Sequence, residues 1–563
     1  MSVATDGTKG ANTITGRSAF LALLKDEGVT TLFGNPGTTE LPIMHALSEH
    51  PDLGYVLGLQ EAIVIAMADG FTRASGRLTS CNVHVAPGLG NAIGAIYTAM
   101  MSGTPMIVTA GQQEQGHGLT EPLLYAPLVP IATPVVKWAT EVTRIEDLPR
   151  IMRRAAKIAT TAPTGPVFIS LPGDILNDEA PLDLGESTRV DTAVRPSDTA
   201  LEAFARRLLA AKSPVIVAGT EIVTSDALAE AARFAELLGA PVWQQTVNTG
   251  AHFLSEHPCF MGSLNRNQRA VRDILAPHDL LLCLGADVLQ MSVYSEIEPL
   301  PVDTRVLQIG LRDWEMGKNF PAEIALRADV KETLKALIPV LERLGGATLA
   351  SKARTSIAGL SAKNWSAKRE AKRQQTALRA EASPMHPEWV MMRLSERLPA
   401  DAIVVDEGLT SANSLVSYWP FRDRYSYFGN VSGGIGWGIA AAVGVQLAQP
   451  KRRVVAVIGD GSSMYSIQAI WSAAHYKLPV TFLIANNGGY QILKDRLKLF
   501  HGNDKPIGMD FRDPPIDFSG LARSFGLTAR RATTALEFDA ALDAAMAKTD
   551  GPTLIEAMVG KAT

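Results

Sequence analysis

A carboxylate and a carboxamide follow two neighbouring apolar runs of this sequence, at the point where each run ends. The run VVAVIG ends in the turn GDG around Asp460, and the run VTFLIA ends in the turn NNG around Asn487. Between them, apolar residues at helical spacing over 464–474 predict one crossover helix, so the segment is a right-handed βαβ unit with both turns at one sheet edge. Carboxylate, amide and carbonyl oxygens suit Mg²⁺, and the N–H groups after Gly461 can bind a phosphate. Either turn alone would be ordinary, whereas the pair favours a phosphate and metal site.

The rest of the chain supplies the elements that must hold such a site. Apolar strand-like runs alternate with helical segments through three regions, which predicts α/β domains with doubly wound parallel sheets. A Lys/Arg/Ala/Ser-rich stretch before the third region could be a nucleic-acid patch, but a solvated, partly helical linker fits the negative overall charge better. The expected boundaries are 15–185 for the first domain, 195–345 for the middle domain, 346–383 for the linker and 384–560 for the third domain.

Composition narrows the function classes. The 563 residues are 46% hydrophobic and 20% charged, as in an ordinary globular protein, and the formal net charge of −4 gives no attraction for nucleic acid. The three cysteines, Cys81, Cys259 and Cys283, are too widely spaced for a disulfide framework or a metal cluster and favour a reducing compartment. The opening MSVATDGTKGANTITG has no apolar signal segment, and no apolar run is long enough to span a membrane. We therefore expect a cytoplasmic protein with no nucleic-acid or membrane partner.

Two parts of the sequence bear on nucleotide binding, the glycine-containing segment GLGNAIG and the middle region. The sequence GLGNAIG follows the strand-like TSCNVHV, but its spacing departs from GxGxxG and the next strand does not end in an acidic residue. Nicotinamide binding is therefore rejected. The middle region shows no Gly-rich phosphate loop and no catalytic cluster, so a structural role is the simplest interpretation. Nucleotide binding by this region remains an alternative.

The 27 positions from Asp460 to Asn487 resemble the diphosphate-binding signature of the thiamine diphosphate-dependent 2-oxo acid decarboxylases. Segments along nearly the whole chain, including FGNPGTTELP, LGLQEA, NVHVAPGLGNAIGA and GDGSSMYSIQAIWSAA, match the benzoylformate decarboxylase branch of that family. The resemblance implies a pyrimidine-binding, a middle and a diphosphate-binding domain, with thiamine diphosphate and Mg²⁺ as cofactors. It also implies a homotetramer made of two dimers, in which each site is shared between two subunits.

The resemblance assigns roles to residues of this sequence. Glu61 corresponds to a glutamate that exchanges a proton with the cofactor pyrimidine, and His84 to a histidine that moves protons near the substrate. Thr38 stands where these enzymes carry a serine that binds the substrate carboxylate. Without the resemblance, Glu61 would be a first-turn helix glutamate and His84 a hydrogen-bonded strand-end histidine. The implied cofactor-binding residues are Glu61, Leu409, Thr410, Gly433, Ile435, Asp460, Gly461, Ser462, Asn487 and Tyr490, with Asp460, Asn487 and the Gly489 carbonyl as metal ligands.

The substrate pocket departs from the pattern of that branch. Ser292 stands where a second active-site histidine is expected, and Arg496 stands where an aromatic residue lines the phenyl site. Arg496 could pair with a polar or anionic group of the substrate, or it could extend to solvent. Thr38 and His84 would share this pocket with Ser292, Ile492, Leu493 and Arg496.

Three functions follow from these residues. Non-oxidative decarboxylation of a 2-oxo acid to an aldehyde and CO₂ is preferred. A carboligase or lyase that forms or cleaves acyloins or 2-hydroxyacyl compounds, as acetolactate synthases do, is the alternative that the absence of the second histidine favours. A non-catalytic thiamine diphosphate-binding protein is the third, and the joint presence of Glu61, Asp460 and Asn487 argues against it.

Overall fold

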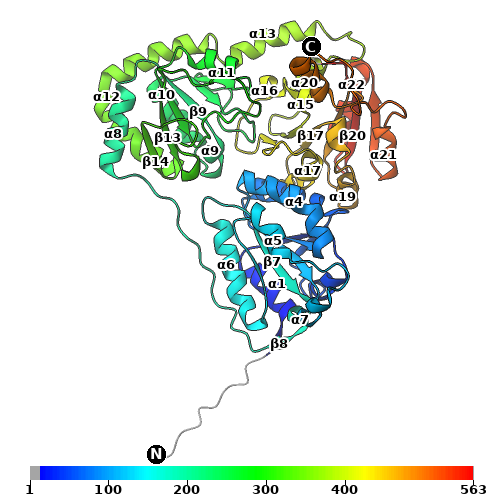
Figure 1. The fold of residues 1–563 in the computed structure, drawn as a ribbon. Coiled ribbons are helices and arrows are strands. Elements are labelled where there is room, and N and C mark those ends of the chain that lie inside the picture. Colours follow the sequence, from blue (N-terminus) through cyan, green and yellow to red (C-terminus); the bar gives the residue numbers. More distant parts are fainter. Residues whose placement is uncertain (1–12, 562–563) are drawn as a thin grey trace, which may run out of the picture. The chain divides into compact units, whose positions relative to one another are not determined.

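The computed structural model describes residues 13–561, in which three six-stranded sheets are parallel throughout. Helices lie beside each of these sheets (Figure 1). Strands of doubly wound sheets are covered on both faces, which explains why runs such as VVAVIG and VTFLIA are apolar throughout and fully buried. The predicted fold class, three doubly wound α/β domains, is confirmed.

The first sheet has the strand order β3-β2-β4-β5-β7-β6. Its core packs helix α1 (Gly16–Asp26) and helix α6 (Leu148–Thr160) against buried aliphatic side chains of the sheet. Helix α3 (Glu61–Ser75) follows β3, and helix α4 (Val85–Ser102) follows β4. The strands are β2 (Thr31–Gly34), β3 (Gly54–Leu57), β4 (Thr79–His84), β5 (Met106–Gln112), β6 (Ala139–Glu141) and β7 (Val167–Pro172).

The middle sheet has the order β11-β10-β9-β12-β13-β14. Helices α8 (Asp198–Leu209), α10 (Leu228–Leu238) and α12 (Val330–Ser361) gather on one side of it and share one core (Figure 1). The strands are β9 (Pro214–Ala218), β10 (Val242–Gln244), β11 (Phe260–Ser263), β12 (Leu280–Leu284), β13 (Arg305–Gly310) and β14 (Ile324–Arg327).

The third sheet has the order β16-β15-β17-β18-β20-β19. Helices α14 (Pro387–Arg397) and α22 (Ala535–Ala547) pack in its core, where the Trp389 and Phe538 rings meet edge to face. The strands are β15 (Ile403–Glu407), β16 (Tyr427–Gly429), β17 (Val454–Gly459), β18 (Thr481–Asn486), β19 (Thr528–Ala532) and β20 (Thr553–Met558).

Each sheet contains a switch point, formed by two neighbouring central strands whose crossovers run in opposite directions along the sheet. In the first sheet this switch point lies between β2 and β4, in the middle sheet between β9 and β12, and in the third sheet between β15 and β17. Loops leaving the two central strands there diverge to opposite faces and open a crevice at the carboxyl ends. The fold therefore offers three candidate sites, one for each sheet.

One local prediction differs from the structure, and two stretches singled out in the sequence prove to be helical. The single crossover helix expected over 464–474 is two short helices, α18 (Asp460–Ser463) and α19 (Ala469–His475), because the first turn is taken up by the GDG segment. Helix α4 begins at Val85, so GLGNAIG lies inside a helix. The linker stretch is largely helical: α12 runs through it with a kink at Gly346, and α13 (Trp365–Ala377) follows.

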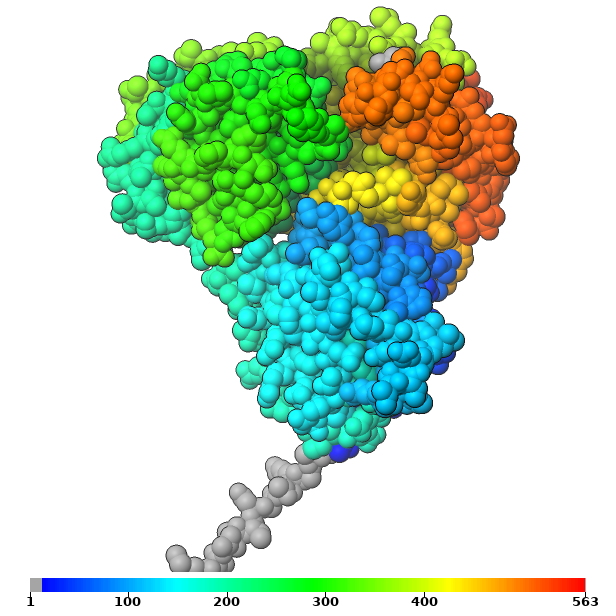
Figure 2. Space-filling model, in the orientation of Figure 1, coloured from blue at the N-terminus to red at the C-terminus, as the bar shows by residue number. Residues whose placement is uncertain are grey.

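The linker is largely exposed, as expected, and a few of its side chains are buried. Trp365 is 3% exposed, and its Nε1 donates to the Val416 carbonyl at 2.9 Å. In the space-filling view the yellow-green residues of this part of the chain lie along the green middle region and the orange third region (Figure 2). Burial of the indole thus ties the linker to the third region.

By its contacts the chain forms two compact units. One contains residues up to Val190 with segments 440–449 and 466–475, and the other contains the remaining residues. The expected boundaries at 15–185, 195–345, 346–383 and 384–560 stay predictions. Among residues 13–561, no helix combines the length and the apolar character that crossing a membrane requires.

Candidate active site

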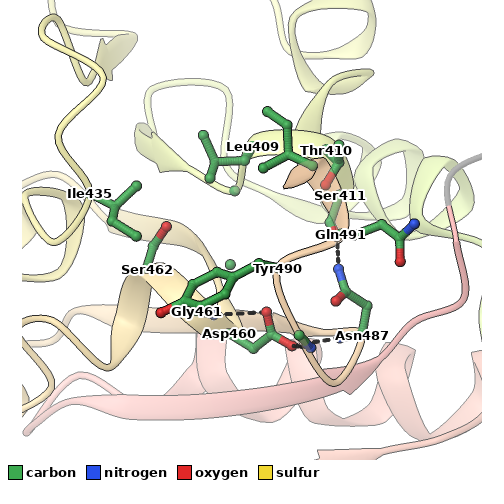
Figure 3. Close-up of a pocket in the computed structure, with 14 residues that line it drawn as sticks. Leu409, Thr410, Ser411, Ile435, Asp460, Gly461, Ser462, Asn487, Tyr490 and Gln491 are labelled. Atoms are coloured by element: carbon green, nitrogen blue, oxygen red, sulfur yellow. Dashed lines mark hydrogen bonds between the residues drawn. The ribbon is translucent and has the colours of Figure 1, made fainter. Parts of the chain in front are cut away.

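The Asp460 carboxylate is the centre of the third-sheet switch point. Asp460 is 3% exposed and begins α18 directly after β17. Its Oδ2 accepts from the backbone N–H groups of residues 487, 488 and 489 at 3.1, 2.7 and 3.0 Å, and its Oδ1 accepts from Gly461 at 2.8 Å (Figure 3). The loop after β18 therefore folds onto the carboxylate, as the βαβ reading predicts.

Two buried oxygens beside Asp460 have no hydrogen-bond partner among the described residues. They are Asn487 Oδ1 and Ser462 Oγ. The Asn487 amide is fixed by its Nδ2, which donates to Ser411 Oγ at 3.2 Å (Figure 3). A buried acceptor left unpaired costs about 1–3 kcal/mol, so a cation at Oδ1 and a phosphate at the serine would remove this cost. The residues present therefore fit Mg²⁺ and a diphosphate.

The Gly489 carbonyl is the third expected metal ligand. It accepts from the Gln491 N–H at 2.9 Å, which leaves a second lone pair free. A Cβ on Gly489 would lie 2.2 Å from the Met509 carbonyl oxygen, so the loop needs glycine here. No group of three or more His, Cys, Asp or Glu that could hold a metal occurs in residues 13–561, in keeping with a donor set that has a single carboxylate.

Burial raises the pKa of the Asp460 carboxyl, and the four N–H groups that it accepts oppose this rise. Because burial disfavours the charged form, a bound cation would stabilise the carboxylate. The electrostatics of the site therefore favour a cation.

A cavity at this switch point brings together most of the predicted cofactor-binding residues (Figure 3). Leu409 is strained, since its φ is +48°, and strain in a non-glycine residue marks functional loops. A Cβ on Gly461 would lie 2.5 Å from the Tyr490 ring, so glycine is required for this ring to approach. Predicted residues lining the cavity are Leu409, Thr410, Ile435, Asp460, Gly461, Ser462, Asn487, Gly489, Tyr490 and Ile492, whereas Gly433, Ser292, Leu493 and Arg496 do not line it.

A buried glutamate that the sequence did not single out fixes the loop carrying Ile435. Glu407 is 3% exposed and ends β15. Its Oε1 accepts from Asn430 Nδ2 at 2.7 Å and from the Gly436 N–H at 3.0 Å, and its Oε2 accepts from the Gly438 N–H at 2.8 Å. Burial raises the pKa of Glu407 to about 7. The glutamate therefore positions the glycine-rich loop beside the cavity.

In the first sheet, Glu61 lies at the start of α3 and is 8% exposed. Its Oε2 accepts from Asn91 Nδ2 at 3.0 Å. A Cβ on Gly88 would lie 2.9 Å from Glu61 Oε1 and 3.3 Å from the His84 Cβ, so both predicted catalytic side chains adjoin this glycine. Gly88 and Asn91 belong to GLGNAIG, which therefore shapes the surroundings of Glu61.

His84 is held by a second buried glutamate that the sequence analysis missed. Glu40 is fully buried, and its Oε2 lies 2.8 Å from His84 Nδ1. Glu40 also accepts from the Gly37 and Gly111 N–H groups, each at 2.9 Å. The pairing through Nδ1 leaves Nε2 for other partners. Thr38 begins the short 3₁₀ turn in this loop and is exposed.

Ser292 and Arg496, two of the predicted substrate-pocket residues, lie outside the cavity around Asp460. Ser292 is exposed in the loop after β12. The Arg496 guanidinium lies 5.5 Å from the Phe500 ring centroid, one helical turn further along α20 (Gln491–His501). The pKa of Arg266 is lowered mainly by burial and also by the positive charge of Arg496, so these two arginines lie near each other.

The middle-sheet switch point is filled by the chain itself. A Cβ on Gly219 would lie 2.3 Å from Ala286 Cα, so the two loops there touch. Glu221 accepts from the Leu311 and Arg312 N–H groups at 2.6 and 3.3 Å, and burial raises its pKa to about 7. The Glu221 carboxylate therefore joins the segment after β9 to the loop after β13.

The chain matches three family models over most of its length. They are described as the N-terminal TPP binding domain, the central domain and the C-terminal TPP binding domain of thiamine pyrophosphate enzymes, and they match residues 14–122, 201–337 and 410–557.

Curated relatives and solved structures extend the match to nearly the whole chain. Benzoylformate decarboxylase of Pseudomonas aeruginosa is 35% identical over 545 residues, which cover 96% of this chain and 98% of that protein. The acetolactate synthase large subunit of Haemophilus influenzae is 26% identical over 94% of this chain and 92% of its own. The thiamine diphosphate-dependent 4-hydroxybenzoylformate decarboxylase of Rhodococcus jostii superimposes with a TM-score of 0.85 at 32% identity, covering 98% of this chain and 100% of that one.

Proposed function

Because the chain belongs to the family of thiamine diphosphate-dependent 2-oxo acid decarboxylases, we propose that it converts a 2-oxo acid to an aldehyde and CO₂ without oxidation, with Mg²⁺ as its metal. The observation that supports this proposal most is the unpaired, buried Asn487 Oδ1 beside the Asp460 carboxylate. Thiamine diphosphate, when bound, supplies a nucleophilic carbon and an electron sink for the carboxylate's bonding pair.

The chain's own residues would bind and orient the reactants. Asp460, Asn487 and the Gly489 carbonyl would hold Mg²⁺, with its remaining positions open to the diphosphate. The Gly433 carbonyl would accept from the pyrimidine amine, and the Ile435 side chain would hold the two cofactor rings at an angle. Leu409, Thr410, Gly461, Ser462 and Tyr490 would contact the diphosphate end.

Proton transfer would fall to residues of the first domain. Glu61 would hold the proton exchanged with the pyrimidine nitrogen, and Thr38 would bind the substrate carboxylate through its hydroxyl. His84 would move the proton to the product at Nε2, because Glu40 already fixes Nδ1.

We propose that the substrate side chain lies near Ile492, Leu493, Ser292 and Arg496. The relatives named for benzoylformate and 4-hydroxybenzoylformate support an aryl 2-oxo acid. Arg496, in place of an aromatic residue, favours a substrate with a polar or anionic substituent.

A second candidate function is carboligation or lyase chemistry on acyloins or 2-hydroxyacyl compounds. Two observations favour it: acetolactate synthases are among the relatives, and Ser292 stands where a second histidine would help to protonate the product.

We propose a homotetramer of two dimers with shared sites in the cytoplasm. Exposed apolar side chains support an interface on the first domain: Tyr97 and Met100 on α4 are 45% and 36% exposed, and Leu119 is 97% exposed. The three cysteines are free and buried, which suits a reducing compartment.

The activity test incubates the protein with Mg²⁺, thiamine diphosphate and a panel of 2-oxo acids, with and without an acceptor aldehyde. Production of CO₂ with one aldehyde per turnover supports decarboxylation. Acyloin as the main product supports the second candidate. No turnover with any acid or acyloin refutes both.

The assembly test co-expresses Glu61→Ala and Asp460→Ala chains, each expected to be inactive alone. If each site takes Glu61 from one subunit and Asp460 from its partner, a mixed dimer contains one doubly damaged site and one intact site. Random pairing then restores roughly a quarter of all sites. Purified mixed dimers that stay at the background of the single variants would refute the shared site.

A further inference from the structure

The basic stretch of the linker turns four side chains of α13 toward one cavity. Trp365, Lys368, Arg369 and Lys372 follow the spacing of one helix face, and all four line a cavity of about 340 Å³. The opposite walls come from β10 and the edge strand β11 of the middle sheet and from α16 (Leu415–Tyr418). Three of the eight basic residues in the stretch 351–383 therefore line one cavity.

The cavity wall carries three cationic side chains and no acidic one. Lys372 is compensated, since its Nζ lies 2.7 Å from Glu388 Oε1. Among residues 13–561, neither Lys368 nor Arg369 forms an ion pair within 4.0 Å, although the negative charges of Glu256 and Glu396 act on Arg369 from outside this cavity. Burial lowers the pKa of both Lys368 and Arg369, which is the electrostatic cost that a bound anion would reduce.

Aromatic rings lie beside Lys368 and Arg369. Lys368 Nζ lies 4.7 Å from the Trp243 ring centroid and donates to the Met261 carbonyl at 3.0 Å. The Arg369 guanidinium lies 5.3 Å from the Trp365 ring centroid. Stacking on a ring leaves the N–H groups of each cation free to donate sideways.

The rest of the wall is apolar or neutral and polar. Gly262 keeps the floor open, because a Cβ there would lie 3.7 Å from the Trp243 ring and 4.0 Å from the Trp365 ring. Apolar surface is provided by Trp243, Met261, Leu264 and Val416, and neutral hydrogen-bonding groups by Asn248, Ser263, Asn265, Asn413 and Ser417.

We propose that this cavity is a binding site for a small organic anion, a carboxylate or a phosphate carried on an apolar or aromatic body. The cationic wall would bind the anionic group, and the apolar floor would contact the body. The size falls in the range of small-molecule sites, roughly 300–1,000 Å³, and is too small for a nucleic-acid duplex. The cavity shares no lining residue with the cavity around Asp460, so it is a separate site.

Calorimetric titration of the protein loaded with Mg²⁺ and thiamine diphosphate tests this site. The probes are adenosine 5′-monophosphate and phenylacetate, each paired with its uncharged counterpart, adenosine and phenylacetamide. We expect one of the anions to bind, and its neutral counterpart to bind at least about ten-fold more weakly. The phosphate and carboxylate arms distinguish the two sources of negative charge.

Variants assign the binding to the cavity. Lys368→Gln and Arg369→Gln should each weaken binding of the anion by about ten-fold. Asn413→Trp adds a ring at an exposed position of the cavity wall and should block anion binding. Lys451→Gln, which removes an exposed charge that does not line the cavity, is the matched control and should bind the anion as the wild type does. Circular dichroism confirms that each variant is folded.

Three results would overturn the proposal. They are no binding of either anion up to about 10 mM, equal binding of anion and neutral counterpart, and undiminished binding by both Lys368→Gln and Arg369→Gln. Because the readout is binding at a separate cavity, failure here leaves the proposed decarboxylation untouched, and a failed activity test leaves this site untouched.

Discussion

Replacing Glu407 by glutamine tests whether the buried glutamate positions the loop that carries Ile435. The carboxylate accepts from the Gly436 and Gly438 N–H groups through different oxygens. An amide has one acceptor oxygen, so Glu407→Gln must turn its NH₂ group toward one of these donors and leave that N–H unpaired. An unpaired buried donor costs about 1–3 kcal/mol, and displacement of the loop would relieve it.

If the loop must return to this position when the cofactor binds, the penalty appears in cofactor affinity. A cost of 1–3 kcal/mol corresponds to binding of thiamine diphosphate that is weaker by about 5- to 150-fold. Equilibrium titration of the apoprotein with thiamine diphosphate at saturating Mg²⁺, followed by calorimetry, measures this ratio.

Glu221→Gln is the matched control. Glu221 also accepts from two backbone N–H groups and has its pKa raised to about 7 by burial, but it lies at the middle-sheet switch point. The Glu221→Gln substitution should lower the free energy of unfolding without changing the affinity for thiamine diphosphate. A folded Glu407→Gln protein that binds cofactor as tightly as the wild type would refute the positioning role, and an equal loss in both variants would show a general effect of damaging a buried carboxylate.

The pH dependence of stability gives a second readout for Glu407. Burial raises its pKa from an ordinary value of 4.5 to about 7, so between these pH values the folded protein binds the proton that the unfolded chain has lost. The glutamate's contribution to the free energy of unfolding is therefore greatest below pH 4.5 and falls as the pH rises to about 7, by about 3 kcal/mol in all. As the pH rises from 4.5 to about 7, the free energy of unfolding of the wild type should fall relative to that of Glu407→Gln. A difference between the two proteins that does not change with pH would contradict the raised pKa.

Three further substitutions test the proposed site. Glu61→Gln should lose most turnover yet keep the fold and cofactor affinity, because an amide cannot exchange the pyrimidine proton; a kcat near that of the wild type would remove Glu61 from the mechanism. Asp460→Ala should weaken Mg²⁺ and thiamine diphosphate binding far more than it lowers the melting temperature, and unchanged affinity in a titration would exclude the metal site. Arg496→Phe should shift kcat/KM from polar or acidic 2-oxo acids toward aromatic ones, and an unchanged ratio would place the arginine outside the pocket.

The sequence predicts the sheets well because buried parallel strands are recognisable without tertiary information. VVAVIG and VTFLIA could be assigned as strands from their apolar character, and parallel pairing then brought Asp460 and Asn487 to one edge. Helix ends were less predictable. Helix α4 begins at Val85, so that Gly88 lies within the helix against Glu61, a contact that the glycine spacing does not indicate.

The buried glutamates could not be found from local pattern. Glu40 follows a threonine pair in a loop, and its partners Gly37, His84 and Gly111 are up to 71 positions away. A charged residue in a loop is usually solvated, so only the fold reveals that this one is fully buried. Contacts of this kind depend on how separate loops meet, which sequence spacing does not encode.

All three sheets use the same chemical device next to the strands that flank their switch points. Glu40, Glu221 and Glu407 each place a carboxylate where it accepts from backbone N–H groups of a neighbouring loop. In the two outer sheets a residue just after a central strand is also strained, with φ of +46° at Val85, directly after β4, and +48° at Leu409, two residues after the end of β15. Loops that diverge at a switch point expose N–H groups that no strand can satisfy, and a carboxylate satisfies several at once while fixing the loop. In the third sheet Ile435 lines the cavity around Asp460, whereas in the middle sheet Gly219 lies against Ala286 and closes the corresponding space. The same arrangement of a buried carboxylate and backbone N–H donors therefore lies beside the proposed catalytic residues of the first and third sheets and beside a close loop contact in the middle sheet.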